Sequence, residues 1–372
     1  MDKDTTYVPA THRSRLEWLD AMRGFTMLLV VAYHVAQTSF QMPLKQSASM
    51  PFLVLLRMPL FFFVSGFLAY SRQAVWGGGQ WFRAVLKKSR VQLLPTVVFM
   101  LLFALLMSKH PWEAWLRMLQ LPTKGGYWFT WTLLLMFVFY FSVEAVVWWT
   151  KRLPFLRQSS DLAVRPPFLP LFVCWLLSLV WYETAYLPAH FHYLKEDFWQ
   201  WSSLVQVALY LHFFLFGNLV RRRWTDVQRL FDSRWFFPLV LVVAIVCCGD
   251  ALKWHTLRLA WSNLPRTLAM YALLLLLVMT FRYYALFFSR VTWVGRSLQY
   301  VGRRTLDIYL LHFFLLPALP EMGKWLNATR PGFVVEQALT LGVAAVVVMA
   351  CCLLSHLLRV SPLLRYYLFG RK

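Results

Sequence analysis

The sequence predicts an all-α, polytopic membrane protein, and two observations carry that prediction. Of the 372 residues, 59% are hydrophobic and only 15% are charged, whereas soluble domains have about 45–50% apolar and about 25% charged residues. Apolar runs of about 20 residues, each able to cross ~30 Å of hydrocarbon, also recur along the whole chain. We therefore expect about ten transmembrane helices.

Each predicted span is an apolar run bounded by charged or aromatic residues, as interfacial anchoring favours. The first run, unlike a cleaved signal peptide, is not followed by a small-residue cleavage site, so we expect it to stay in the protein. In chain order the spans are expected near residues 21–40, 52–70, 91–109, 128–149, 167–186, 203–220, 235–252, 266–283, 304–319 and 335–358.

Positive charge predicts the orientation. With the amino terminus inside, 26 of the 38 Lys and Arg residues fall on cytoplasmic segments, ten on the opposite loops and two, Arg23 and Arg57, within or at the ends of spans. This imbalance follows the positive-inside rule and accounts for the net charge of +22 without nucleic acid. We expect both termini in the cytoplasm. Because independent domains need at least ~50 residues and the loops are shorter, we expect one integral-membrane domain over 1–372 and no separate soluble domain.

The first span carries Asp20, Arg23 and His34 in an otherwise apolar run. Eleven positions separate Arg23 from His34, which at 100° per residue places both on one helix face, roughly 16 Å apart along the axis. A guanidinium near the cytoplasmic surface suits phosphate, and a mid-membrane imidazole can accept and return a proton. The structural alternative is that Arg23 snorkels to the interface and His34 hydrogen-bonds a neighbouring helix.

The second span adds Arg57, a third intramembrane cation, and the step Ser65-Gly66. Ionisable groups inside spans are costly and therefore functional candidates. Gly66 permits close helix approach, so a packing role is the alternative for the Ser-Gly step.

Further ionisable groups are expected to have structural roles. Asp307 and His312 are five residues apart on the ninth span, about 140° around a helix, so they do not form a dyad; Asp307 with Tyr309 is expected to hold helices together or to pair an arginine. Structural roles are also expected for Glu144 and His212; the alternative is that each supports the site through a neighbouring residue. The five cysteines lie in apolar runs without metal-ligand spacing, so neither a metal site nor disulfides are expected.

The ordered motifs of the chain resemble those of integral-membrane acyltransferase family 3, which includes bacterial O-acetyltransferases of surface glycans. The first motif is Arg-x10-His on the first span, preceded by Leu-Asp-x-x-Arg-Gly. The further motifs are Phe-Phe-Phe-Val-Ser-Gly-Phe at 61–67, Arg90 with Pro95, Tyr-Trp-Phe at 127–129, Phe-Leu-Phe-Gly at 214–217, the run from Tyr300 to His312, and Ser-Pro-Leu-Leu at 361–364. Two features depart from the family: Gly-Tyr-Trp-Phe-Thr stands where it usually has His-Leu-Trp-Phe-Leu, and no hydrolase-like soluble domain follows the last span.

The resemblance implies transfer of an acyl group, commonly acetyl, from cytoplasmic acyl-CoA to a sugar hydroxyl, in the inner or plasma membrane of a bacterium. The coenzyme A phosphates would meet Arg23 and Arg90, and His34 would be the general base or would carry the acyl group briefly. Arg57, Ser65 or a tyrosine would stabilise the oxyanion. The predicted catalytic residues are His34, Arg23 and Asp20; the predicted substrate- and CoA-binding residues are Arg57, Ser65, Arg90, Tyr309 and His312. The implied partners are acyl-CoA, a glycan or sugar acceptor and the bilayer, with no tightly bound cofactor.

Two alternatives stay open. Buried His, Arg and Glu also suit a transporter or flippase of a glycan or lipid precursor, although no internal repeat of the kind common in transporters is evident. The same fold with a succinyl donor, or with a lipid-linked or small-molecule acceptor, is equally compatible with the sequence.

Overall fold

The computed structural model describes residues 16–71, 76–150, 168–185, 197–251 and 263–369, so the ends of the predicted domain and parts of several predicted loops lie outside the described residues. The described segments contain helices and no strand. In chain order they are α1 (Glu17–His34), the π-helical turn η1 (Val35–Ser39), α2 (Met50–Ala69), α3 (Gly78–Met107), α4 (Pro111–Gln120), the 3₁₀ turn η2 (Lys124–Gly126), α5 (Trp128–Thr150), α6 (Phe168–Ala185), α7 (Asp197–Ser202), α8 (Leu204–Arg222), α9 (Trp224–Phe231), α10 (Phe236–Ala251), α11 (Leu264–Tyr283), α12 (Trp293–Arg303), α13 (Thr305–Leu315), α14 (Pro320–Thr329), α15 (Phe333–Leu358) and α16 (Pro362–Phe369).

Each of the ten predicted apolar runs falls on a helix, but not every helix has the length of a span. Among the described residues seven helices are long and apolar enough to cross a membrane, and the pair α9–α10, bent by 82°, raises the number to eight if it is one span. The remaining two, α6 and α13, are shorter apolar helices. The chain is thus an all-α, multi-pass membrane protein, and ten spans with both termini inside stay a prediction.

The predicted ninth span is the one that differs most from its helix. We expected 304–319, whereas α13 has 11 residues and is about 16 Å long at 1.5 Å per residue. Its end has a local cause, because Leu316 is extended with ψ 119° and precedes Pro317, whose ring disfavours helical geometry in the residue before it. By itself α13 therefore spans only about half the thickness of the hydrocarbon layer.

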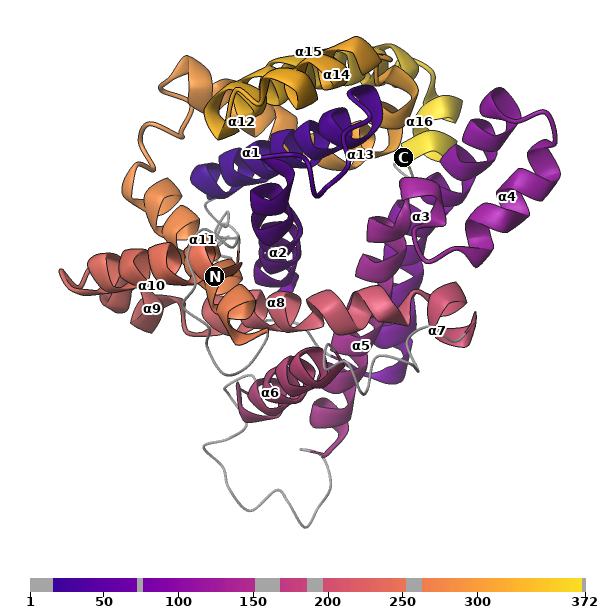
Figure 1. The fold of residues 1–372 in the computed structure, drawn as a ribbon. Helices are drawn as coiled ribbons and strands as arrows, with labels where there is room; N and C mark the ends of the chain where they lie inside the picture. Colours follow the sequence, from indigo (N-terminus) through magenta and orange to yellow (C-terminus); the bar gives the residue numbers. More distant parts are fainter. Residues whose placement is uncertain (1–15, 72–75, 151–167, 186–196, 252–262, 370–372) are drawn as a thin grey trace, which may run out of the picture.

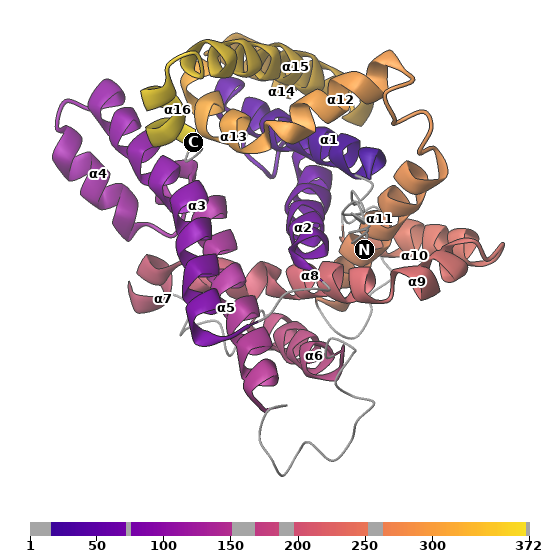
Figure 2. The same ribbon diagram turned by 180° about the vertical axis from the view of Figure 1, so that it is seen from behind.

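The helices surround α2 (Figures 1 and 2). On one side α2 packs against α1, which in turn contacts α12, α13 and α15; on the other side it packs against α8, and α8 contacts α5 and α6. The long helix α3 pairs with α5 and contacts α13 and α16. This arrangement brings α1, α2, α3, α5 and α13 around one region, where the candidate site lies.

Two glycine crossings fix the helices that carry the sequence motifs. A Cβ atom on Gly302 of α12 would lie 1.9 Å from the carbonyl oxygen of Asp20, and one on Gly66 of α2 would lie 1.8 Å from that of Phe214 on α8. The partners are also glycines, Gly24 on α1 and Gly217 on α8, with equally little space. Backbones approach this closely only where side chains are absent, so the packing role expected for Gly66 is confirmed.

Buried ion pairs join further helices, as expected for Asp307 and Glu144. Asp307 on α13 accepts a hydrogen bond from Ser355 Oγ on α15 at 2.7 Å and one from Nη2 of Arg359, the residue that caps the C-terminus of α15, at 2.6 Å. Glu144 on α5 pairs with Arg222 of α8. Removing one partner of such a pair typically costs about 3–5 kcal/mol, so both carboxylates stabilise the bundle.

The loop before α2 is held by a single buried carboxylate. Glu336, in the first turn of α15, accepts hydrogen bonds from the hydroxyls of Ser47 and Ser49 and from the backbone N–H groups of Ala48 and Ser49. Because this loop links η1 to α2, Glu336 fixes the start of α2, the helix that carries Arg57.

Candidate active site

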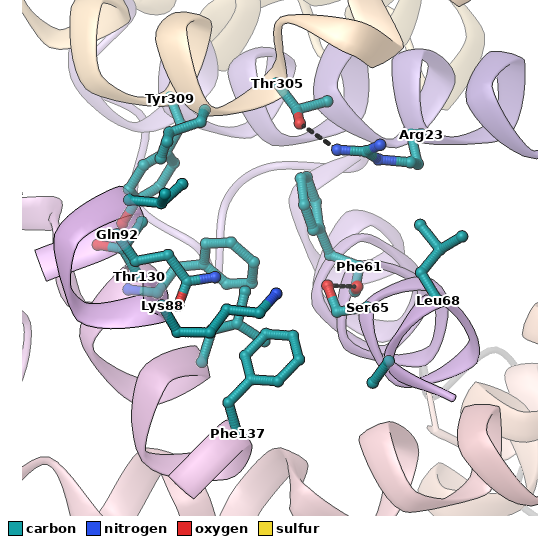
Figure 3. Close-up of a pocket in the computed structure, with 15 residues that line it drawn as sticks. Arg23, Phe61, Ser65, Leu68, Lys88, Gln92, Thr130, Phe137, Thr305 and Tyr309 are labelled. Atoms are coloured by element: carbon teal, nitrogen blue, oxygen red, sulfur yellow. Dashed lines mark hydrogen bonds between the residues drawn. The ribbon is translucent and has the colours of Figure 1, made fainter. Parts of the chain in front are cut away.

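A cavity of about 280 Å³ opens between α1, α2, α3, α5 and α13. Its polar lining residues are Arg23, Ser65, Lys88, Gln92, Thr130, Thr305 and Tyr309, and among the described residues that line it none is acidic. Figure 3 shows Arg23 and Lys88 facing the space from opposite sides. The cavity therefore offers positive charge and hydrogen-bonding groups inside an apolar bundle.

Arg23 is held in place by its neighbours. Its Nη2 donates to Thr305 Oγ1 on α13 at 3.0 Å, and Nη1 lies 3.8 Å from a carboxylate oxygen of Asp20, one turn earlier on α1. The side chain is 28% exposed, so the guanidinium remains open to the cavity. Of the predicted catalytic residues, Asp20 thus acts on Arg23 and does not itself line the cavity.

Lys88 is the charged cavity residue that sequence reasoning missed, and Gln92, Thr130 and Thr305 are further polar lining residues that it did not predict. The Nζ atom of Lys88 lies 3.6 Å from the centroid of the Phe137 ring, and the side chain is within electrostatic reach of Arg23. We expected the third span to begin near residue 91 and counted Lys88 as a loop charge, but α3 begins at Gly78. The signal that would have found it is helical spacing, since Lys88, Val91 and Gln92 share one face.

The wall between α3 and α5 is polar. Thr96 and Thr130 share a hydrogen bond of 2.6 Å, and Thr130 lines the cavity with Gln92. The buried Gln92 Oε1 has no hydrogen-bond partner among the described residues. Such an amide oxygen is available to a ligand that carries N–H groups.

Tyr309 lines the cavity and has a structural hydroxyl. That hydroxyl donates to the carbonyl of Gly126 at 2.7 Å and accepts from the N–H of Phe129 at 3.1 Å. Gly126, with φ +98°, stands where the related motif has histidine, and a Cβ atom there would meet the Phe313 ring at 2.4 Å. In this chain the turn at Gly126 thus presents a backbone carbonyl to Tyr309.

Beyond Tyr309 lies a pair of imidazoles. His34 and His312 have ring centroids 5.2 Å apart, and His312 is 5.9 Å from the Tyr309 ring. His312 Nδ1 donates to the backbone carbonyls of Ile308 and Tyr309, at 3.1 and 2.7 Å. The lone pair of the imidazole is therefore on Nε2. Within the described part of the chain His312 Nε2 has no hydrogen-bond partner. His34 is partly exposed and within electrostatic reach of Arg57.

The predicted site residues therefore divide into two groups. Three of them, Arg23, Ser65 and Tyr309, line the cavity, and the other five do not: Asp20, His34, Arg57, Arg90 and His312. Arg23 and His34 both face α13, through Thr305 and His312 respectively, as the eleven-residue spacing predicted.

Ser65 and Arg90 have local partners. The Ser65 hydroxyl donates to the carbonyl of Phe61 at 2.9 Å, one turn earlier on α2 (Figure 3). Arg90 turns away from the cavity and places its Cζ 4.3 Å from the Tyr366 ring centroid on α16. Among the described residues no three His, Cys, Asp or Glu side chains gather as metal ligands.

Of three comparisons with known proteins, one gives a match, to a protein family. A search of curated proteins and a search of solved structures found no match. The model of a family described as an acyltransferase domain matches residues 16–357, which include every helix that surrounds the cavity. The chain therefore belongs to this family of integral-membrane acyltransferases.

Proposed function

We propose that this protein transfers an acyl group, most simply acetyl, from cytoplasmic acyl-CoA to a hydroxyl of a sugar or glycan precursor. The observation that carries the proposal is the cavity that Arg23 and Lys88 face from opposite sides. Two cations with no acidic lining residue favour phosphate, and a guanidinium recognises phosphate by paired hydrogen bonds.

The size of the cavity decides how much of the donor it takes. Small-molecule sites span about 300–1,000 Å³, and 280 Å³ is at the lower limit. The cavity therefore takes the phosphate and pantetheine portions, with the nucleotide outside at the predicted cytoplasmic end. The pantetheine amides find Gln92 and Thr130 on the wall, and the thioester points toward Tyr309 and the imidazole pair.

The chemistry requires a base for the acceptor hydroxyl. In our proposal His34 removes the hydroxyl proton, the oxygen attacks the thioester carbonyl, and the carbon–sulfur bond breaks to release coenzyme A as thiolate, which takes up the proton. General-base catalysis of this kind contributes about 10² to 10⁴ in rate. Arg57, within electrostatic reach of His34, supplies positive charge near the developing oxyanion.

Family membership favours acyl transfer over the transport of a glycan or lipid precursor, because the match covers the cavity helices. We further propose that both termini are cytoplasmic, that Asp20 orients Arg23, and that the protein works in the inner or plasma membrane of a bacterium. A glycan acceptor on the outer face is consistent with His34 lying at the end of α1 opposite to Arg23.

The test is acetyl transfer from radiolabelled acetyl-CoA in membranes that carry His34→Ala. The proposal predicts a loss of at least 100-fold in labelled glycan, as expected for removal of a general base. The matched control is His110→Ala, which removes an exposed imidazole before α4 and should leave the labelling intact. Undiminished labelling by a normally inserted His34→Ala protein would refute the base.

A further inference from the structure

A groove of about 840 Å³ lies between α12 and α15 and shares no lining residue with the cavity of the candidate site. Both helices pack against α1 (Figure 1), and Leu28 of α1 is part of the lining. Most of the lining is apolar, with Val301 on α12 and with Ala345 and Val348 on α15. Small-molecule sites span about 300–1,000 Å³, so the groove has room for a ligand.

One wall of this groove is open to the surroundings of the protein. Met349 and Leu353 of α15 line the groove and are 59% and 69% exposed. The helix α15 is long and apolar enough to cross a membrane, so its exposed apolar side chains meet the hydrocarbon of the bilayer. The occupant that these surroundings offer to the groove is therefore a lipid acyl chain.

The length of the groove matches one leaflet of a bilayer. On α15 the lining runs from Ala345 to His356, which is about 16 Å along the helix axis at 1.5 Å per residue. That is about half of a hydrocarbon layer of ~30 Å, the depth that one acyl chain fills. In the predicted orientation α15 ends at the cytoplasmic side, so His356 lies at the headgroups of the inner leaflet and Ala345 near the bilayer centre.

The charged groups of the groove favour an anionic headgroup. Arg296 on α12 and His356 on α15 line the groove and are exposed, and none of its described lining residues is acidic. Within the described part of the chain neither side chain has a hydrogen bond or an ion pair with another residue. A second guanidinium, that of Arg304, lies over the ring of the lining residue Tyr300, with Cζ 3.8 Å from the centroid. Basic side chains at the membrane surface attract anionic lipids.

The helix α12 itself has the character of an interfacial helix. Trp293 and Tyr300 are seven residues apart, which at 100° per residue places them on one helix face. Both line the groove, and they are 74% and 43% exposed. Tryptophan and tyrosine prefer the level of the headgroups, and basic helices with such rings lie in the membrane plane. Arg296, about one turn after Trp293, is then at the level of the lipid phosphates.

We infer that the groove between α12 and α15 binds a glycerophospholipid of the inner leaflet that has an anionic headgroup. One acyl chain lies between the two helices, and the headgroup phosphate accepts hydrogen bonds from Arg296 and His356. A guanidinium binds phosphate through paired hydrogen bonds. The inference does not depend on the proposed function, because the groove and the cavity have no lining residue in common.

The experiment is photolabelling of the full-length protein in detergent with phosphatidylglycerol that carries a diazirine on one acyl chain, followed by mass spectrometry of the peptides. We expect labelled peptides from α12 and α15. Ala345→Phe, which fills the end of the groove away from His356, should lower this labelling at least fivefold. The matched control is Val346→Phe, because Val346 is the next residue, is 61% exposed and does not line the groove. Its labelling should stay at the wild-type level.

Headgroup selectivity is measured by competition in the same assay. Unlabelled phosphatidylglycerol should displace the probe at a concentration at least fivefold lower than phosphatidylcholine does. Arg296→Gln should remove this difference. Arg229→Gln removes a guanidinium that is 85% exposed on the same predicted face, and it should keep the difference.

Three results would overturn the inference: labelling of α12 and α15 that Ala345→Phe leaves unchanged, equal displacement by the two lipids, or a preference that survives in Arg296→Gln. Displacement by glycerol 3-phosphate as effective as that by phosphatidylglycerol would assign the cations to a soluble phosphate and would overturn the lipid site. An unlabelled wild-type groove together with a dimer in light scattering would assign the groove to a second copy of the chain, which also overturns the inference.

Discussion

Replacing Glu336 by glutamine changes a buried carboxylate that anchors the loop before α2. The carboxylate accepts four hydrogen bonds, two from serine hydroxyls and two from backbone N–H groups, and it is 4% exposed. A hydrogen bond to a charged group contributes about 1.5–3 kcal/mol and a neutral one about 0.5–1.5 kcal/mol. The amide also presents N–H groups where one oxygen accepted, so at least one bond is lost.

The sum of these changes predicts a destabilisation of about 2–4 kcal/mol, after allowance for the lower cost of burying a neutral amide. For a chain of this size that corresponds to a fall in Tm of about 3–5 °C. Thermal unfolding in detergent, followed by intrinsic fluorescence, measures it. The control is Glu321→Gln, whose carboxylate is 80% exposed and pairs with Lys324, and which should change Tm by less than about 1 °C. Equal Tm values for both variants would refute the role of Glu336.

Three further predictions concern stability. Gly302→Ala should destabilise the protein by about 1–3 kcal/mol, because the new Cβ atom would lie 1.9 Å from a carbonyl oxygen of α1. The control Gly342→Ala, with nothing within 4 Å of its Cβ atom, should not destabilise it. Equal melting curves for the two variants would contradict the close crossing. Asp307→Asn should cost about 2–4 kcal/mol in detergent unfolding, since Arg359 would lose its charged partner; a loss below about 1 kcal/mol would contradict this. Burial lowers the pKa of Lys124 to about 8, so between pH 8 and about 10 the unfolded chain binds more protons than the folded one. The free energy of unfolding of the wild type, relative to that of Lys124→Met, should therefore rise over this pH range. A constant difference in Tm between the two proteins across that range would contradict this.

Patterning predicted the helices well because apolar length decides where a chain enters a bilayer. All ten predicted runs are helical, and the eleven-residue spacing correctly indicated that Arg23 and His34 face one neighbouring helix. What the pattern could not supply is the length of α13. Its end depends on the extended Leu316 before Pro317, a local backbone effect that a hydropathy window averages away.

The candidate site was predicted only in part, for a different reason. Sequence reasoning grouped residues by the helix that carries them, so Lys88 was counted as an orientation charge. Its position beside the cavity arises from the packing of helices far apart in sequence, which places Arg23 and Lys88 on opposite sides of one space. Tyr309 shows the converse, since the family resemblance implied substrate binding while the two hydrogen bonds of its hydroxyl serve the turn at Gly126.

The central claim is that Arg23 and Lys88 hold the phosphates of an acyl-CoA donor in one cavity. Calorimetric titration of coenzyme A into Lys88→Met and Lys87→Met protein tests it most directly, because the two lysines are adjacent but only Lys88 lines the cavity. The account predicts at least tenfold weaker binding for Lys88→Met, or about 1.4 kcal/mol, and wild-type affinity for Lys87→Met. Equal affinities for the two variants would contradict it.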